Sequence, residues 1–281
     1  MALIEVLGLK ADIIEEVKEI FQSEIKADQR TTSRPDTPSN RPSASVQRAV
    51  VSASYFNSHA IKTDGSLWAW GCNDHGQIGD GSTQSRSTPV RVGAVNNWAA
   101  VSVGDEFTLA LKSDGSLWVC GYNFWNQLGI GIEPGDTPAP VQLDKASDWT
   151  TVSAGGYHSL AIKSDGTLWA WGLNSNSQLG DCTTIERYRP TPVGTDSATS
   201  TAMWSTHWSP FLVATDSDWV SVSAGEKFSL AIKKDGSLWA WGKNNNGQLG
   251  DGTRTDQSAS VRIGIDSDWA TVSAGGHHSL A

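Results

Sequence analysis

Residues 155–181 read GGYHSLAIKSDGTLWAWGLNSNSQLGD, and near copies of this stretch along the chain decide the fold. Its core, SLAIKSDGTLWAWG from Ser159, recurs as SHAIKTDGSLWAWG from Ser58, TLALKSDGSLWVCG from Thr108 and SLAIKKDGSLWAWG from Ser229. The Asp-Gly pairs of the four copies begin at residues 64, 114, 165 and 235, so the steps between copies are 50, 51 and 70 residues. Self-similarity at a nearly fixed period indicates a repeat architecture, in which each copy is one supersecondary unit.

Each copy predicts a β-hairpin with one further strand on either side. Short runs of aliphatic and aromatic residues flank the Asp-Gly pair, which is typical of two strands joined by a tight turn. A VSAG-like strand precedes each hairpin, and a Trp stands just ahead of it at positions 98, 149, 219 and 269. A strand beginning with Pro follows the first three hairpins, at Pro89-Val90, Pro140-Val141 and Pro192-Val193, with Ser260-Val261 in the last. Pro at a strand start fits an edge strand, so we expect four-stranded antiparallel blades of an all-β propeller.

The quoted unit resembles the repeat of the regulator-of-chromosome-condensation family, and the likeness covers roughly residues 49–281. The resemblance implies a β-propeller, usually of seven blades, and very diverse roles: guanine-nucleotide exchange on a small GTPase, chromatin binding, ultraviolet sensing and β-lactamase inhibition. This chain holds four complete units and the first two strands of a fifth. We therefore expect an incomplete or truncated propeller of about four to five blades, in a fragment of a longer product. A four- or five-bladed closure, or assembly with a second copy through open strand edges, is the alternative.

The segment ahead of the repeats predicts a helix and a linker. In residues 1–27, an apolar stripe of Ile13, Ile14, Val17, Ile20, Phe21 and Ile25 follows one helical face, which indicates a short amphipathic α-helix. So short a helix is marginal alone, and we expect it to dock on the repeats, a second copy or a partner. Residues 28–48 are rich in Pro, Ser and Thr, as linkers are. The predicted domains are therefore 1–27, 28–48 and 49–281.

Composition excludes several functional classes. A net charge of −9 and a pI near 5.1 disfavour direct nucleic-acid binding. The sequence has no apolar run long enough to span a membrane, and its first residues make a poor secretory signal. Three Cys without a C-x-x-C pair suit a reducing compartment. We therefore predict a cytoplasmic protein.

The chemistry-bearing residue types fit structural roles. Eleven of the 14 Trp stand at repeat positions, which indicates packing; the remainder are Trp125, Trp204 and Trp208. In the photoreceptor members of the family, key Trp follow the VSAG-like Gly; the stretches here, beginning at Asp105, Gly156, Glu226 and Gly276, contain none. The Asp-Gly pairs lack the ligand spacing of a calcium loop, and no His pair or nucleophile stands in a catalytic or metal-binding pattern. We predict no enzymatic activity, cofactor or metal.

One segment breaks the repeat. The step from the Pro-Val strand to the next Trp is 8 residues in three units but 26 residues from Val193 to Trp219, which adds 18 residues within about 195–215. Insertions in repeat proteins often form the binding surface, and aromatic side chains with Met are common interface anchors. The candidate partner-binding residues are Met203, Trp204, His207, Trp208 and Phe211. The alternative is that this loop caps a propeller edge.

Three functions follow from these observations. The first is a non-enzymatic scaffold that binds an unidentified protein partner through the propeller loops and the 195–215 insert. The second is a guanine-nucleotide exchange factor for a small GTPase. The third is a carbohydrate- or surface-binding module of a virion or cell envelope, which would use Trp204 and Trp208.

Overall fold

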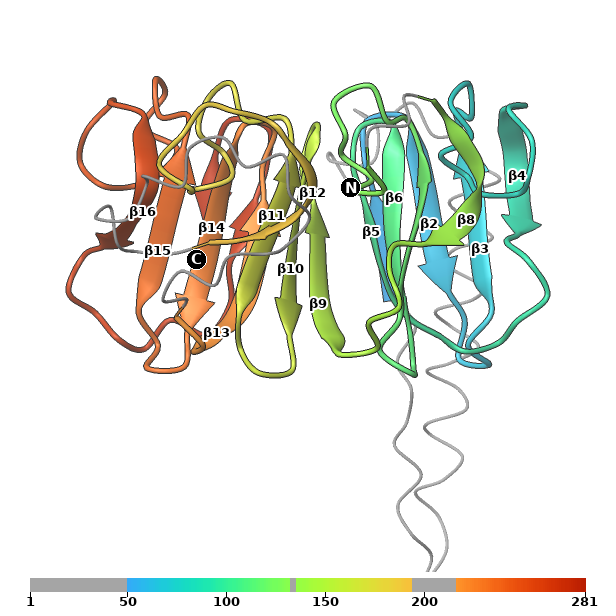
Figure 1. The fold of residues 1–281 in the computed structure, drawn as a ribbon, viewed down its shortest axis with the longest axis horizontal. Coiled ribbons are helices and arrows are strands. Elements are labelled where there is room, and N and C mark those ends of the chain that lie inside the picture. The colour runs from blue at the N-terminus through green and yellow to red at the C-terminus, as the bar shows by residue number, and fades with distance from the viewer. Residues whose placement is uncertain (1–49, 132–134, 194–215) are drawn as a thin grey trace, which may run out of the picture. The chain divides into compact units, whose positions relative to one another are not determined.

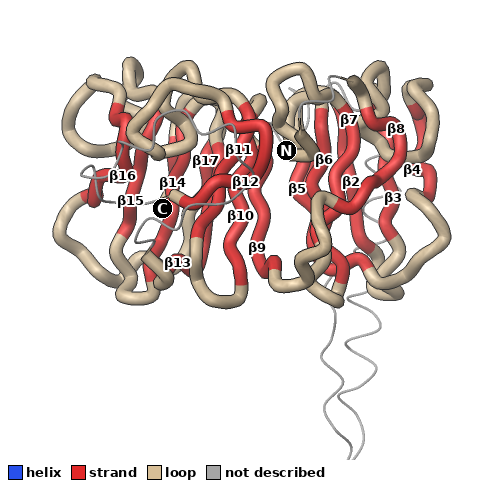
Figure 2. The backbone as a smooth tube through the Cα atoms, in the orientation of Figure 1, coloured by secondary structure: helices blue, strands red, loops and turns tan. Residues whose placement is uncertain are grey.

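The computed structural model describes residues 50–131, 135–193 and 216–281, and every regular element within these ranges is a β-strand (Figure 2). The chain divides into two compact units, residues 1–45 and 46–281, and all of the strands belong to the second. The expected N-terminal helix, the linker and the 195–215 insert lie outside the described residues.

Sixteen strands form four antiparallel sheets, and each sheet is one copy of the repeat, so the predicted blades are confirmed (Figure 1). Within each sheet the strands pair in chain order. The first blade contains β1 (Val50–Ala53), β2 (Asn57–Ile61), β3 (Leu67–Gly71) and β4 (Arg86–Arg91). The second contains β5 (Trp98–Val103), β6 (Phe107–Lys112), β7 (Leu117–Gly121) and β8 (Thr137–Gln142).

The remaining strands repeat this order. The third blade contains β9 (Trp149–Ala154), β10 (His158–Lys163), β11 (Leu168–Gly172) and β12 (Arg187–Pro192). The fourth contains β13 (Trp219–Ala224), β14 (Phe228–Lys233), β15 (Leu238–Gly242) and β16 (Gln257–Ile263). A last pair, β17 (Ser273–Ala274) and β18 (Ser279–Leu280), corresponds to the first two strands of a further unit. Trp98, Trp149 and Trp219 open their strands instead of standing ahead of them, because pairing reaches further back than the VSAG-like segment.

The Asp-Gly hairpin turn is confirmed, and it carries a hydrogen-bond relay. In the second blade Gly115 takes a positive φ of 79°, as a tight hairpin loop requires. The Asp114 carboxylate accepts bonds from the backbone N–H and the hydroxyl of Ser116, at 3.0 and 2.6 Å. These bonds lower the pKa of Asp114. The Ser116 hydroxyl in turn accepts the indole N–H of Trp118 at 2.9 Å, so the turn fixes the first Trp of the third strand.

The N-x-x-x-Q segment that follows the third strand, at Asn73, Asn123, Asn174 and Asn244, also forms a structural turn. Asn174 Oδ1 accepts the backbone N–H of Leu179 at 3.0 Å, and its Nδ2 donates to the carbonyls of Thr183 and Ile185 at 3.1 and 3.0 Å. Ser177, the residue before the Gln, has a φ of 59°. One Asn side chain therefore organises the loop that leads to the fourth strand.

The pairing of the fourth strands corrects one predicted repeat position, that of the Pro residue in the third blade. Thr191 pairs with Ala170, as Val90 pairs with Ala69, so Pro190 is the equivalent of Pro89. Pro192 stands two residues further along, and the predicted equivalence of Pro192-Val193 with Pro89-Val90 is wrong. The segment R-P-T-P-V offers two candidate Pro residues, and only strand pairing distinguishes them. Counted from Thr191, the step to Trp219 is 28 residues instead of 26, so the break adds 20 residues.

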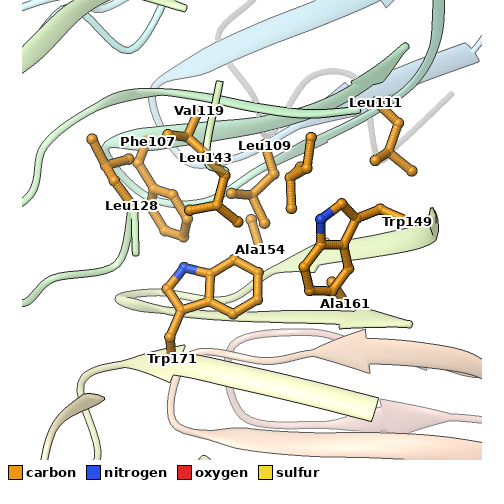
Figure 3. Packing of buried hydrophobic residues seen from close by; sticks show 11 residues of the cluster. Phe107, Leu109, Leu111, Val119, Leu128, Leu143, Trp149, Ala154, Ala161 and Trp171 are labelled. Carbon is orange, nitrogen blue, oxygen red and sulfur yellow. The ribbon is translucent and has the colours of Figure 1, made fainter. Parts of the chain in front are cut away.

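The core lies between successive blades (Figure 3). Trp149 and Trp171 of the third blade pack against Leu109, Leu128 and Leu143 of the second. At the end of the third blade that carries the Asp-Gly turn, the Lys163 ammonium lies 4.7 Å from the ring centre of Trp149 and 5.0 Å from that of Trp169. A cation over aromatic rings is stabilised by their electron-rich faces. The repeated Trp residues are therefore packing residues.

Candidate functional site

Two sets of loops meet at one end of the blades. The turn between the first and second strands hydrogen-bonds to the residue just after the third strand in every blade. In the second blade, for example, the Tyr122 N–H donates to the Glu106 carbonyl at 2.9 Å. The same contact joins Cys72 to Phe56, Leu173 to Tyr157 and Lys243 to Lys227. These loops carry residues that differ from blade to blade, so this end presents side chains that the repeat itself does not prescribe.

Two carboxylates from different blades converge at this end, across a glycine. A Cβ placed on Gly156 of the third blade would lie 3.2 Å from Asp105 Oδ2 of the second and 2.9 Å from the Glu226 backbone oxygen of the fourth. Gly156 therefore leaves the space into which these side chains reach. Burial, the Glu226 charge and the Glu106 charge raise the pKa of Asp105 to about 6. Raised carboxyl pKa values of this kind cluster at functional sites.

Basic groups border these carboxylates. The Lys227 ammonium lies 3.1 Å from Glu226, and the His277 imidazole lies 3.4 Å from the other oxygen of the same carboxylate. His75 of the first blade has its Nδ1 at 2.9 Å from Asp136 and its Nε2 at 3.8 Å from Glu106. The imidazole of His75 therefore links the first two blades at this end.

Aromatic rings lie beside the carboxylates. Tyr122 lies 4.5 Å from His75 and 6.4 Å from Tyr157 between ring centres, and it stacks with Phe124 at 6.2 Å. Trp125 packs edge-on against Phe124 at 4.9 Å. Phe124 is 61% exposed. We call this surface the acidic–aromatic face: His75, Asp105, Glu106, Tyr122, Phe124, Trp125, Asp136, Tyr157, Glu226, Lys227 and His277.

The sequence-predicted site residues Met203, Trp204, His207, Trp208 and Phe211 all lie outside the described residues. Of the three Trp left over from the repeat, Trp125 is described, and it belongs to the acidic–aromatic face. Asp105 and Glu226 were not among the site residues predicted from the sequence. The available signal was that these turn positions vary among otherwise uniform copies.

The described residues contain no cluster of His, Cys, Asp or Glu able to hold a metal ion. Within the same ranges, no helix is long and apolar enough to cross a membrane. The three Cys are free thiols. Burial raises the pKa of the Cys120 thiol to about 12, so this group is a poor nucleophile.

Family comparison matches the repeats over most of the chain. A model described as the regulator of chromosome condensation (RCC1) repeat matches residues 64–111, 114–162, 165–232 and 235–281. A second RCC1 repeat model matches residues 49–77, 98–127, 149–178 and 219–248. The first set begins at each Asp-Gly pair, and the second begins near each first strand.

Individual relatives share this repeat. The ultraviolet-B receptor UVR8 of Arabidopsis thaliana is 28% identical over 218 residues, which cover 76% of this chain and 46% of the receptor. Among solved structures, human WBSCR16 has a TM-score of 0.68 at 22% identity, covering 85% of this chain and 59% of that one. Prp20p of Saccharomyces cerevisiae has a TM-score of 0.66 at 20% identity, covering 89% and 59%. The chain thus spans about half the length of these proteins, and the structural likeness shows a shared fold.

Proposed function

Because the chain belongs to the regulator of chromosome condensation (RCC1) repeat family, we propose that it is a non-enzymatic module that binds a protein partner through its acidic–aromatic face. The observation that carries this proposal is the convergence of Asp105 and Glu226 over Gly156, beside Tyr157. An ionised Asp105 is unfavourable where it stands, since its pKa is raised to about 6. Proteins retain such groups where function requires them.

The chemistry of the face favours a partner segment that carries Arg or Lys. Four carboxylates lie on this face, at Asp105, Glu106, Asp136 and Glu226, against one Lys. A guanidinium group pairs with carboxylates and stacks on aromatic rings, and the acidic–aromatic face presents both kinds of group. Charge complementarity of this kind steers association and gives it a strong dependence on salt.

The 195–215 insert forms a second, separate part of the proposed binding surface. Its described flanks bond to the Asp-Gly-turn end of the third blade, Val193 to Leu168 and Trp219 to Gly166, which is the end opposite to Gly156 and Tyr157. The insert supplies the apolar anchors Met203, Trp204, Trp208 and Phe211 together with His207, whereas the face supplies charge. A Trp204→Ala/Trp208→Ala variant tests the contribution of the insert separately.

The test uses an Arg-rich peptide of defined sequence, titrated against the full chain and followed by tryptophan fluorescence. We expect binding that weakens with salt and is lost in Asp105→Asn/Glu226→Gln. The matched control is Asp266→Asn/Asp268→Asn, which removes the same charge from an exposed loop and should bind as the wild type does. Equal weakening in both double variants would reduce the effect to net charge and would contradict a specific face. Affinity capture of cellular proteins with the same variants then extends the result from the peptide to natural partners.

A guanine-nucleotide exchange activity is the second candidate, and it is supported by the fold shared with Prp20p, whose structure was reported with its binding properties to Gsp1p and histones. Any GTPase captured with the wild-type chain tests it, because an exchange factor would accelerate nucleotide release. We also propose a cytoplasmic location, which the three free thiols support, since thiols stay reduced there.

A further inference from the structure

At two core positions of its second strand the first blade carries polar residues, where the second and fourth blades carry only apolar ones. In the second strand of the second blade, Phe107 and Leu109 pair with Gly121 and Val119, and both side chains are fully buried towards the third blade. The equivalent pairs are His158 and Leu160 in the third blade and Phe228 and Leu230 in the fourth. In the first blade these positions hold Asn57 and His59, which pair with Gly71 and Ala69. Both are as buried as the residues they replace, with exposed fractions of 3% and 1%.

These polar side chains lack partners. Among the described residues, Asn57 Nδ2 has no hydrogen-bond partner, and neither His59 ring nitrogen has one of good geometry. Asn57 Oδ1 is satisfied, because the Ser54 hydroxyl donates to it at 2.9 Å. Burial lowers the pKa of His59 to about 4, against a weaker interaction with the Ile78 backbone that raises it, so the ring is neutral near pH 7. Both residues thus carry unmet hydrogen-bonding capacity inside the protein.

A third unpaired group comes from the turn that contains Ile78. Gln77 is fully buried, and its Oε1 accepts the backbone N–H of His75 at 3.0 Å, but its Nε2 has no partner among the described residues. The Gln77 backbone carbonyl receives the Thr108 hydroxyl at 2.9 Å, which places this turn between the first and second blades. Gln127 and Gln178 have the same unpaired amide at the next two junctions, but Leu109 and Leu160 stand there in place of His59. At the second of these junctions His158 Nδ1 is unpaired as well, whereas its Nε2 lies 3.0 Å from Ser229 Oγ.

The unpaired atoms together match the bonding capacity of water. Two amide donors, Asn57 Nδ2 and Gln77 Nε2, accompany a neutral imidazole; with its N–H directed to the Ile78 backbone, the other ring nitrogen is an acceptor. A water molecule accepts two hydrogen bonds and donates two, and buried waters typically make about three. Buried polar groups are rarely left unsatisfied, and ordered water is the usual partner where no protein group reaches them.

We propose that the junction between the first and second blades holds a buried water site bounded by Asn57, His59 and Gln77, and that this polar seam makes the first blade the one that separates most readily. The neighbouring wall of the junction is apolar, with Ile61, Ile78, Val101 and Val103 in one cluster. Polar groups in such a wall reduce the apolar contact that holds two blades together. The polar groups at this junction therefore favour local separation of the first blade from the second.

Hydrogen exchange of the full chain, read by mass spectrometry, tests the seam. We expect amides of β2 and β3 to exchange before those of β10 and β11. Because the strands of the first blade pack against those of only one other four-stranded blade, the decisive comparison is between variants. His59→Leu restores the residue type of the other copies and should slow exchange in β2 and β3 by about tenfold, without affecting β14 and β15. Leu160→His places the same group in the third blade and should accelerate exchange in β10 and β11.

Exchange in β2 and β3 that is unchanged by His59→Leu would overturn the role of the seam. Asn57→Phe is a second restoring variant, which keeps the test available if one replacement does not fold. A crystal structure tests the water directly. Density for a water about 2.7–3.2 Å from His59 and from one of the two amides supports the site. A dry junction, with the three side chains paired to one another, overturns it.

Discussion

The indole Nε1 of Trp171 donates a hydrogen bond of 2.9 Å to the backbone carbonyl of Gln127, and this bond ties the third blade to the second. The same carbonyl accepts the Ser159 hydroxyl at 2.7 Å. Trp241 repeats the contact one blade further along, donating to Gln178 at 2.9 Å. The third strand of one blade and the Gln turn of the preceding blade therefore form a recurrent joint.

Replacing Trp171 by Phe removes the donor and part of the ring at this joint. We expect a loss of about 1–3 kcal/mol in the free energy of unfolding, from the lost hydrogen bond and the space left behind. Urea denaturation provides the measurement. Trp70→Phe is the matched control, because Trp70 occupies the same repeat position, is only half-buried, and has no acceptor for its indole N–H among the described residues. A loss at Trp70 as large as that at Trp171 would contradict the joint.

His158 makes stability depend on pH in the acid range. Burial lowers its pKa to about 3, whereas an unfolded histidine titrates near 6.5. The unfolded state therefore binds the proton first, and the stability present above about pH 6.5 is lost as the pH falls towards 3. His158→Phe, which copies Phe107 and Phe228, should flatten this part of the stability profile. Chemical denaturation from pH 7 to pH 4 measures it, and an unchanged slope would count against the assignment.

Asp105 acts in the opposite sense. Its pKa in the folded protein, about 6, lies above that of an unfolded aspartate near 3.9, so the folded state binds the proton more tightly. The stabilisation from this proton is present at low pH and is lost as the pH rises through 6. Asp105→Asn should therefore raise the melting temperature at pH 7.5 and have little effect at pH 4.5. Under the proposed function, the same variant binds a basic partner more weakly, which separates stability from function.

The fold could be predicted because the repeated residues carry it. The Asp-Gly turn, the Asn-led loop and the Trp of the third strand each recur with local physical reasons that are visible in one copy. The sequence could not reveal the Asp114–Ser116–Trp118 relay, since it depends on which side chains meet around the turn. It also could not choose between Pro190 and Pro192, because both suit an edge strand.

The candidate site was harder to predict for the opposite reason. Asp105, Gly156 and Glu226 come from three copies, and they occupy a position where the copies disagree. Their proximity follows from how the blades stack, which the sequence of one copy does not encode. In a repeat protein the uniform positions predict the fold, and the variable positions at one end of the blades indicate where to look for function.

Cys182 offers a stabilising substitution. It has a φ of 62°, a left-handed conformation that costs a non-glycine residue about 1 kcal/mol or more. Gly81, Gly131 and Gly252 stand at the same place in the other blades, with φ values of 85°, 105° and 79°. Cys182→Gly should therefore raise the free energy of unfolding, reduced in part by the greater entropy of an unfolded glycine. The backbone bond from Cys182 N–H to the Ser258 carbonyl, 3.0 Å long, stays available to glycine. Cys120→Ala is the contrasting variant, because Cys120 is buried in the core of the second blade and its loss should destabilise the fold. If both variants lowered the urea midpoint, strain at Cys182 would be excluded.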